Sequence, residues 1–326
     1  MKTRQPQSLL EFLQLFSGEP ECIAYLEAVR WPNGFTCPTC GISDTAQRIT
    51  TRPRILRCRH CHKDISLTAG TLMHATRTSL QAWFLAAYLM TTQTPGMSAR
   101  QLQRQLGLSR YETAFQMLHK LRVGMVRPNR DRIGLDWPVE VDETLIGGRT
   151  RGKGRGVHKK ALVVGALEVR TRSIDSKRKA LYAGRLRLCH IENRDAKTLT
   201  GFVGDNVRKG AVVRTDGWDS YDTLPEKGYI HDPMVLEGDP ERMDAHLPMI
   251  HITFSNLKTW LQGTHHSVSK RHLQAYLDEY VFRYNRRFYP MTGFASVLGI
   301  GMGVSSPTYR EFYDGEKAQH THTAGS

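Results

Sequence analysis

The sequence predicts a multidomain α+β protein, in which a small cysteine-containing module and a helical region precede an α/β domain. Three observations support this prediction. Two Cys-x-x-Cys pairs stand in the N-terminal part, apolar residues recur at helical spacing in the segment after them, and strand-like runs beyond residue 138 are interrupted by one amphipathic helix. A chain of 326 residues, 40% of them hydrophobic, is long enough for two or three domains with buried cores.

The charge of the chain indicates a polyanionic partner. The formal net charge is +15, the isoelectric point is about 9.7, and the basic residues are clustered. We therefore expect nucleic acid as the partner. No N-terminal segment has the layout of a signal peptide, and no apolar run reaches the roughly 20 residues of a membrane span. We therefore expect a cytoplasmic protein without membrane association.

The first predicted elements are two short helices and a zinc ribbon. Apolar residues at helical spacing predict the two helices within residues 8–28. Four cysteines in two tight knuckles then supply the ligands of a tetrahedral site: Cys37, Cys40, Cys58 and Cys61. In a reducing compartment such pairs indicate metal rather than disulfides, and their spacing matches a zinc ribbon. Four thiolates leave no open coordination position, so we expect the Zn²⁺ to be structural.

A helix-turn-helix pattern follows an apolar helix over residues 79–91. Ser98 is a good N-cap for the first helix of the pattern, Gly107 provides the turn, and Ser109 is the expected N-cap of the second helix. The second helix should end near Val123. Its candidate DNA-binding residues are polar: Arg110, Gln116, His119, Lys120 and Arg122. The alternative is an ordinary helical hairpin without a DNA-binding role.

A basic loop follows the first strand of the α/β domain. Glycine alternates with arginine or lysine between residues 149 and 160, a composition that cannot fold alone and suits contact with phosphates. The alternative is a flexible, solvated loop. The candidate DNA-binding residues of this loop are Arg151, Lys153, Arg155, Lys159 and Lys160.

The α/β domain carries two acidic residues at corresponding places. Four strands are predicted, over residues 139–146, 161–169, 181–191 and 212–215. A helix capped by Asp195 precedes the fourth strand, an order characteristic of an RNase H-like domain, in which the first and fourth strands pair in parallel. That pairing would bring together Asp142, in the first strand, and Asp216, after the fourth, with Asp219 as the rival of Asp216. Two adjacent carboxylates repel each other and need a divalent cation between them.

The chain resembles the DDE-type transposases of bacterial insertion sequences, specifically those with a zinc ribbon ahead of the catalytic domain. The resemblance rests on the four cysteines and on the segments Val141–Thr144 with Gly147–Gly148, Thr215–Trp218 with Tyr221, Ser255–Leu261, Gly263–His266 and Phe282–Arg287. The family implies metal-dependent cutting and joining of DNA at transposon ends.

The resemblance leaves the third catalytic ligand open. Common family members carry a Glu on a helix and a Lys seven residues later, and Lys258 fits that Lys, but His251 stands at the Glu position. The apolar face of this helix is marked by Ile250, Phe254, Leu257 and Leu261. His251 and Lys258 fall together on one flank of that face, whereas Asn256 falls nearly opposite it. We favour His251 if the helix begins by residue 251, and Asn256 is the alternative.

The resemblance also implies cofactors and partners. Two Mg²⁺ or Mn²⁺ ions would be held by Asp142, Asp216 and either His251 or Asn256, and Lys258 would contact a phosphate near the scissile bond. A neutral third ligand should shift the metal preference from Mg²⁺ toward softer ions. The partners would be double-stranded DNA, as transposon ends and target, and further copies of the chain in a synaptic complex. Such a protein would be nucleoid-associated.

Two other functions remain open. A catalytically degenerate DNA-binding protein derived from a transposase is favoured by the missing Glu and opposed by the two Asp residues. An RNase H-type nuclease is opposed by the DNA-recognition modules. The predicted divisions are a helical lead-in, a zinc ribbon, a helix-turn-helix region, a linker, an RNase H-like catalytic domain with C-terminal helices, and a disordered tail, over residues 1–30, 31–75, 76–126, 127–137, 138–304 and 305–326.

Overall fold

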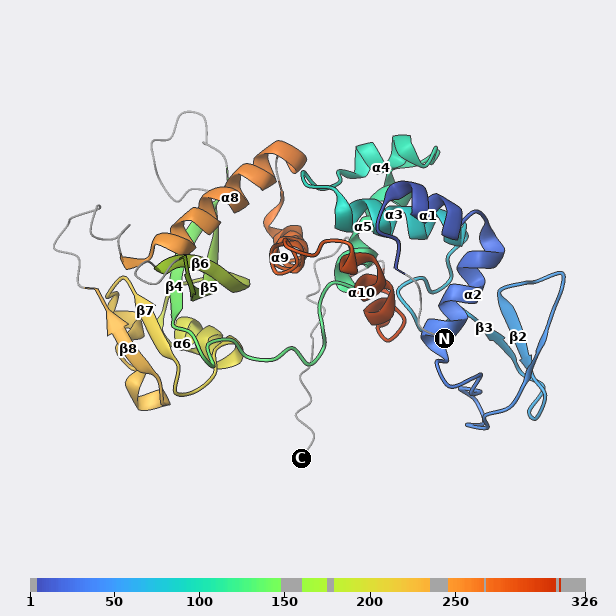
Figure 1. Ribbon diagram of the computed structural model, residues 1–326, viewed down its shortest axis with the longest axis horizontal. Helices are drawn as coiled ribbons and strands as arrows, with labels where there is room; N and C mark the ends of the chain where they lie inside the picture. Colours follow the sequence, from blue (N-terminus) through green and yellow to red (C-terminus); the bar gives the residue numbers. More distant parts are fainter. Residues whose placement is uncertain are drawn as a thin grey trace. The chain divides into compact units, whose positions relative to one another are not determined.

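The computed structural model describes residues 5–147, 160–174, 179–234, 246–266, 268–308 and 311. The chain divides into two compact units (Figure 1). The first unit combines residues 1–127 with residues 288–326, and the second contains residues 128–287. The division after Arg127 falls at the start of the expected linker. No helix in the described part of the chain is both long and apolar enough to span a membrane.

The first unit contains helices and a small antiparallel sheet. Its helices are α1 (Leu9–Leu15), α2 (Glu19–Arg30), α3 (Leu80–Thr92), α4 (Ala99–Gln105), α5 (Tyr111–Val123) and α10 (Thr292–Gly301). Its sheet has the order β1-β2-β3 and is formed by β1 (Ala46–Arg48), β2 (Ile55–Cys58) and β3 (Asp64–Ser66). The two short N-terminal helices and the apolar helix after residue 79 are thereby confirmed.

Helix α10 belongs to the first compact unit, whereas the catalytic domain predicted from the sequence extends to residue 304. Phe294 of α10 packs into an aromatic cluster, with its ring centroid 5.5 Å from that of Phe16 and 5.6 Å from that of Phe84. Gly301 permits this close packing, because a Cβ there would lie 1.8 Å from Cδ2 of Leu72. Contacts between segments this far apart in the chain leave no signal in local periodicity.

The second unit is built on a mixed five-stranded sheet of order β6-β5-β4-β7-β8. The strands are β4 (Val139–Ile146), β5 (Ala161–Ser173), β6 (Lys179–Ile191), β7 (Val212–Thr215) and β8 (Ile230–Pro233). β4, β5 and β6 pair antiparallel, whereas β7 pairs in parallel with both β4 and β8. The predicted parallel pairing of the first and fourth strands is confirmed. The sequence prediction missed β8, a four-residue strand with little burial and therefore no apolar pattern.

Helices cover both faces of this sheet (Figure 1). On one face lies α6 (Ala196–Asn206), whose Leu199 and Val203 join Val141 of β4 in one apolar core. On the other face lie α8 (Pro248–His265) and α9 (Lys270–Tyr284), which form a second core with β5 and β6. The N-cap predicted for α6 is confirmed, because the Asp195 carboxylate accepts a 2.7 Å hydrogen bond from the backbone N–H of Thr198. Two short 3₁₀ turns, η1 (Asp219–Tyr221) and η2 (Pro225–Lys227), lead into β8.

Candidate active site

Asp142 and Asp216 come from two neighbouring parallel strands. Asp142 lies within β4, and Asp216 directly follows β7. In the β4–β7 register Val139 pairs with Val213, and continuing this register by three residues brings Asp142 level with Asp216. Burial raises the pKa of Asp216, and the negative charge of Asp142 contributes in the same direction. The two carboxylates are therefore close enough to interact electrostatically.

Glu143 adds a third carboxylate, which was not among the residues predicted for the site. Burial raises the pKa of Glu143 to about 7, and the charges of Asp142 and Asp216 also raise it. Its Oε1 accepts a hydrogen bond from the hydroxyl of Tyr221, which is fully buried. The sequence signal available for this residue was its position beside Asp142. The three acidic groups give this end of the sheet a concentration of negative charge.

A buried carboxylate holds the start of α8 against β4. Glu140 is 0% exposed, shares a face of β4 with Asp142, and accepts a 2.7 Å hydrogen bond through Oε2 from the backbone N–H of Ile250. Leu247, the N-cap of α8, has no side chain that could satisfy the first turn, so Glu140 does so from the neighbouring strand. Burial raises the pKa of Glu140 to about 7, against the effect of this hydrogen bond. This hydrogen bond fixes the position of the first turn of α8, and therefore also the position of His251, the residue after Ile250.

Gly165 lets α8 approach the sheet closely beside Asp142. It is the cross-strand partner of Asp142 in the β4–β5 pair. A Cβ at Gly165 would lie 2.9 Å from Cε1 of Phe254 and 3.0 Å from Cδ2 of Leu188. A larger residue would therefore push away the ring of Phe254, one turn beyond His251 on α8. The sequence does not reveal this requirement, because it depends on a helix far later in the chain.

The structure brings His251 to Asp142 and leaves Asn256 away from it. Since α8 begins at Pro248, the condition for the helical-face prediction is met. Nε2 of His251 lies 3.2 Å from Oδ2 of Asp142, whereas the Asn256 side chain is exposed. Burial lowers the pKa of Lys258, and this lysine also interacts with the charges of Asp142 and Lys160. Lys258 therefore lies on the same side of α8 as His251.

A second cluster of ligand-type side chains lies in the first unit. The Sγ atoms of Cys37, Cys40, Cys58 and Cys61 all lie within 4.8 Å of one another. Two of the sulfur pairs are 3.6 and 3.8 Å apart, and four sulfurs about 2.3 Å from one Zn²⁺ ion in tetrahedral geometry would be about 3.8 Å apart. The cluster fits zinc. Among the described residues, Asp142, Asp216 and His251 are not drawn together as tightly as these four.

Two protein-family matches cover the regions that contain the acidic residues and the four cysteines. Residues 134–285 match the ISXO2-like transposase domain, and residues 17–64 match the transposase zinc-ribbon domain. The chain belongs to the insertion-sequence transposases that carry an N-terminal zinc ribbon. A relative described as an uncharacterized protein in transposable element ISH50 of Halobacterium salinarum is 26% identical over 289 residues, which cover 83% of this transposase and 92% of that protein. No solved structure gives a significant match.

The helix-turn-helix region of the transposase has the expected turn, and its second helix, α5, ends at Val123 as predicted but has a different N-cap. Ser98 caps α4, and Gly107 adopts a positive φ of 61° in the turn. The predicted cap of α5 is wrong: Arg110 occupies the N-cap position in place of Ser109, without a side-chain capping bond. Arg110 is exposed, and Gln116 and Lys120 are half-buried.

Two polar residues of α5 are buried, contrary to their predicted place on a DNA-facing surface. His119 is 4% exposed and Arg122 is 2% exposed, because both turn toward the interior of the unit with Leu118 and Leu121. Residue type alone suggested an exposed position for these side chains.

The basic loop lies largely outside the described residues, which include neither Arg151, Lys153, Arg155 nor Lys159. Its last residue, Lys160, is described. The charge of Lys160 lowers the pKa of Lys258, although burial has the larger effect on that pKa. The end of the loop therefore lies close to α8.

Proposed function

We propose that this transposase binds the terminal inverted repeats of its insertion sequence and catalyses metal-dependent DNA cleavage and strand transfer. The observation that carries the proposal is the 3.2 Å approach of His251 to Asp142, beside a β4–β7 pair that places Asp216 level with Asp142. These side chains offer the oxygen and nitrogen donors that divalent cations use in phosphoryl-transfer sites. The match to a transposase domain supports the reaction class.

Asp142, Asp216 and His251 are the proposed ligands of the catalytic ions. The donor set fits divalent cations, because burial and the charge of Asp142 both raise the pKa of Asp216, and a cation between the two carboxylates would offset both effects. When bound, Mg²⁺ or Mn²⁺ would activate a water molecule or a 3′-hydroxyl and stabilise the charge that develops on the phosphate. His251 would contribute a neutral nitrogen where the family resemblance implies a Glu, so the site should favour Mn²⁺ over Mg²⁺ more strongly than a three-carboxylate site does. Asn256 is the alternative third ligand.

Lys258 is proposed to hold a DNA phosphate near the scissile bond. It lies on the His251 side of α8, and its ammonium group interacts with the charge of Asp142. A lysine contact with phosphate orients the strand for in-line attack and offsets repulsion between the DNA and the acidic residues. Lys160, close to Lys258, would extend this contact.

Recognition of DNA is proposed for the first unit and the basic loop. The zinc ribbon and the helix-turn-helix would bind the terminal repeats, with base or phosphate contacts from Arg110, Gln116 and Lys120. Arg151, Lys153, Arg155 and Lys159 would join Lys160 along the phosphates of the double-stranded DNA. The proposal includes a homo-oligomeric synaptic complex on DNA and association with the nucleoid.

A strand-transfer assay tests the proposal. A labelled transposon-end oligonucleotide is incubated with a plasmid target in Mg²⁺ or in Mn²⁺, with wild type, Asp142→Ala and Asp216→Ala. Joining by wild type and its loss in both variants would support the transposase. Cleavage without joining would favour a nuclease, and DNA binding without cleavage in either metal would favour a degenerate DNA-binding protein.

A further inference from the structure

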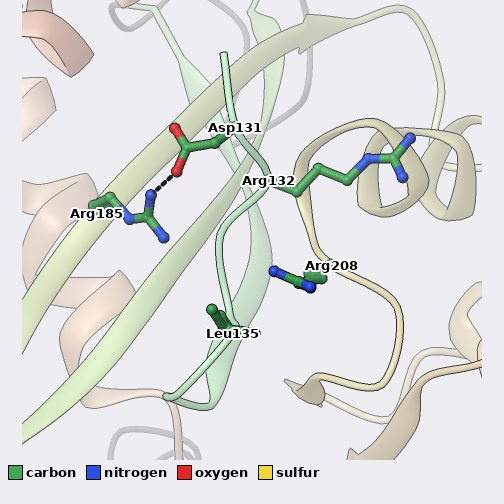
Figure 2. Close-up of a pocket in the computed structure, with 5 residues that line it drawn as sticks. All are labelled: Asp131, Arg132, Leu135, Arg185 and Arg208. Carbon is green, nitrogen blue, oxygen red and sulfur yellow. Dashed lines mark hydrogen bonds and ion pairs between the residues drawn. The ribbon is translucent and has the colours of Figure 1, made fainter.

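An arginine pocket lies in the second unit, away from the acidic residues. It has a volume of about 330 Å³ and is lined by Asp131, Arg132, Leu135, Arg185 and Arg208. Figure 2 shows Arg185 and Arg208 on either side of the segment that carries the other three residues. The pocket adjoins the ends at which β4 and β7 begin, whereas Asp142 and Asp216 lie further along these strands.

A β-bridge fixes the backbone beside Arg132 and Arg208. Ile133 and Val207 form a parallel β-bridge and are both fully buried. Side chains alternate along extended backbone, so their neighbours Arg132 and Arg208 point away from the core, and both are exposed. Two backbone hydrogen bonds reinforce the bridge, from Ile133 N–H to Asn206 O at 2.9 Å and from Arg208 N–H to Ile133 O at 2.8 Å.

The acidic groups around the pocket are already neutralised. Arg185 forms ion pairs with both Asp131 and the buried Glu168, and Glu168 is paired with Arg170 as well. Asp131 also accepts a 2.9 Å hydrogen bond from Arg187 through its backbone oxygen. These contacts engage Arg185, whereas Arg132 and Arg208 take part in none of them.

Arg132 and Arg208 are free to bind a ligand. Within the described residues, neither side chain forms a hydrogen bond or an ion pair with another side chain. Two exposed guanidinium groups beside a pocket offer forked donors that match phosphate oxygens. Leu135, 58% exposed at the same pocket, adds an apolar surface of the kind that can contact a sugar ring.

We propose that this pocket binds a backbone phosphate of duplex DNA, separate from the phosphate that is attacked. The proposal rests on the proposed function, because it assigns a second DNA contact to the same transposase. The pocket would supply a sequence-independent contact on the catalytic unit itself, in addition to the contacts made by the first unit.

The test measures duplex DNA binding over a range of salt concentrations, without divalent metal. It compares wild type with Arg132→Gln/Arg208→Gln and with a control of equal charge change, Lys270→Gln/Arg271→Gln, in the first turn of α9 on the other face of the sheet. We expect the pocket variant to bind on the order of tenfold more weakly at low salt. The slope of log affinity against log salt should fall by about 0.9 for each phosphate that the variant no longer binds. Arg132→Lys/Arg208→Lys should restore most of the slope, because it restores the charge.

Four results would overturn the proposal. The affinity and slope of the pocket variant could equal those of wild type, or they could equal those of the control, which would indicate only a net-charge effect. Millimolar inorganic phosphate could stabilise wild type against heat more than the pocket variant while DNA binding stays unchanged, which would indicate a site for a free anion. Wild type that binds no duplex DNA would refute both this proposal and the proposed function, whereas failure of the pocket alone leaves strand transfer intact.

Discussion

Neighbouring carboxylates of the second unit differ in proton affinity because their partners differ. Glu140 is buried beside backbone amides, and burial raises its pKa to about 7. Glu168 is also buried, which opposes its ionisation, but hydrogen bonds from Arg185, Gly134 and Arg170 lower its pKa to about 2. Burial therefore dominates at Glu140, where backbone amides and the charges of Arg214 and His251 oppose it only in part, and ion pairs dominate at Glu168, which is paired with two guanidinium groups.

The low pKa of Glu168 predicts a pH-dependent contribution to stability. The contribution is fully present above the unfolded pKa of 4.5 and is lost as the pH falls toward the folded value of about 2. We expect Glu168→Gln to lower the free energy of unfolding by about 3 kcal/mol at pH 7, and by little near pH 2. Chemical denaturation at both pH values measures this difference. Asp131→Asn, at an exposed partner of Arg185, is the control and should have a much smaller effect. A Glu168→Gln effect that does not shrink in acid would contradict the account.

At the scale of elements, the position of α8 decides which side chain can complete the proposed metal site. Glu140 secures the first turn of α8 and Gly165 admits its Phe254 against the sheet, so the two together place His251 beside Asp142. Neither support contacts the proposed ions directly. Changes at either position should therefore reduce activity through displacement of α8.

Gly165→Ala tests this positioning. The added Cβ would lie 2.9 Å from Phe254, which should cost about 1–3 kcal/mol of unfolding free energy by overpacking and should reduce strand transfer as α8 moves. Gly201→Ala is the matched control, because a Cβ there meets nothing within 4 Å on α6 and should stabilise by about 0.5–1 kcal/mol. Denaturation and strand-transfer assays of both variants measure these effects. Full activity in Gly165→Ala would contradict the proposed role of the glycine.

Helix α10 gives a second test at this scale. Phe294→Ala should destabilise the first unit by about 3–5 kcal/mol, because its ring fills the centre of an aromatic cluster. Phe288→Ala, at a side chain that is 73% exposed, should change stability by less than about 0.5 kcal/mol. Calorimetry should assign the loss to one of two transitions. A loss in the transition of the second unit instead would return α10 to the catalytic domain.

Local patterns in the sequence predicted the elements well, and long-range packing explains what they missed. Cysteine spacing, apolar periodicity and caps such as Ser98 and Asp195 are properties of short segments, so four strands of the catalytic sheet and the principal helices could be inferred. The short exposed β8, the burial of His119 and the unit to which α10 belongs depend on partners distant in the chain. For the site, the helical face pointed to His251, but the supporting role of Glu140 required the fold.

For the whole molecule, the division into two units predicts separate responses to metal removal. A chelator that removes Zn²⁺ leaves four close thiol groups without their ion, and the ribbon has only three short strands to hold them. We expect chelation to lower the melting temperature of one transition, that of the first unit, and to leave the transition of residues 128–287 in place. Calorimetry with and without chelator checks this expectation. No change in either transition would contradict a structural zinc site.

The metal site proposed for this transposase consists of Asp142, Asp216 and His251. Mn²⁺-dependent strand transfer by His251→Ala, compared with Asn256→Ala, tests whether His251 is its third ligand. The 3.2 Å contact of His251 with Asp142 and the exposure of Asn256 predict that His251→Ala reduces joining on the order of 100-fold or more, while Asn256→Ala stays close to wild type. Full joining by His251→Ala, together with no joining by Asn256→Ala, would contradict this assignment and make Asn256 the third ligand.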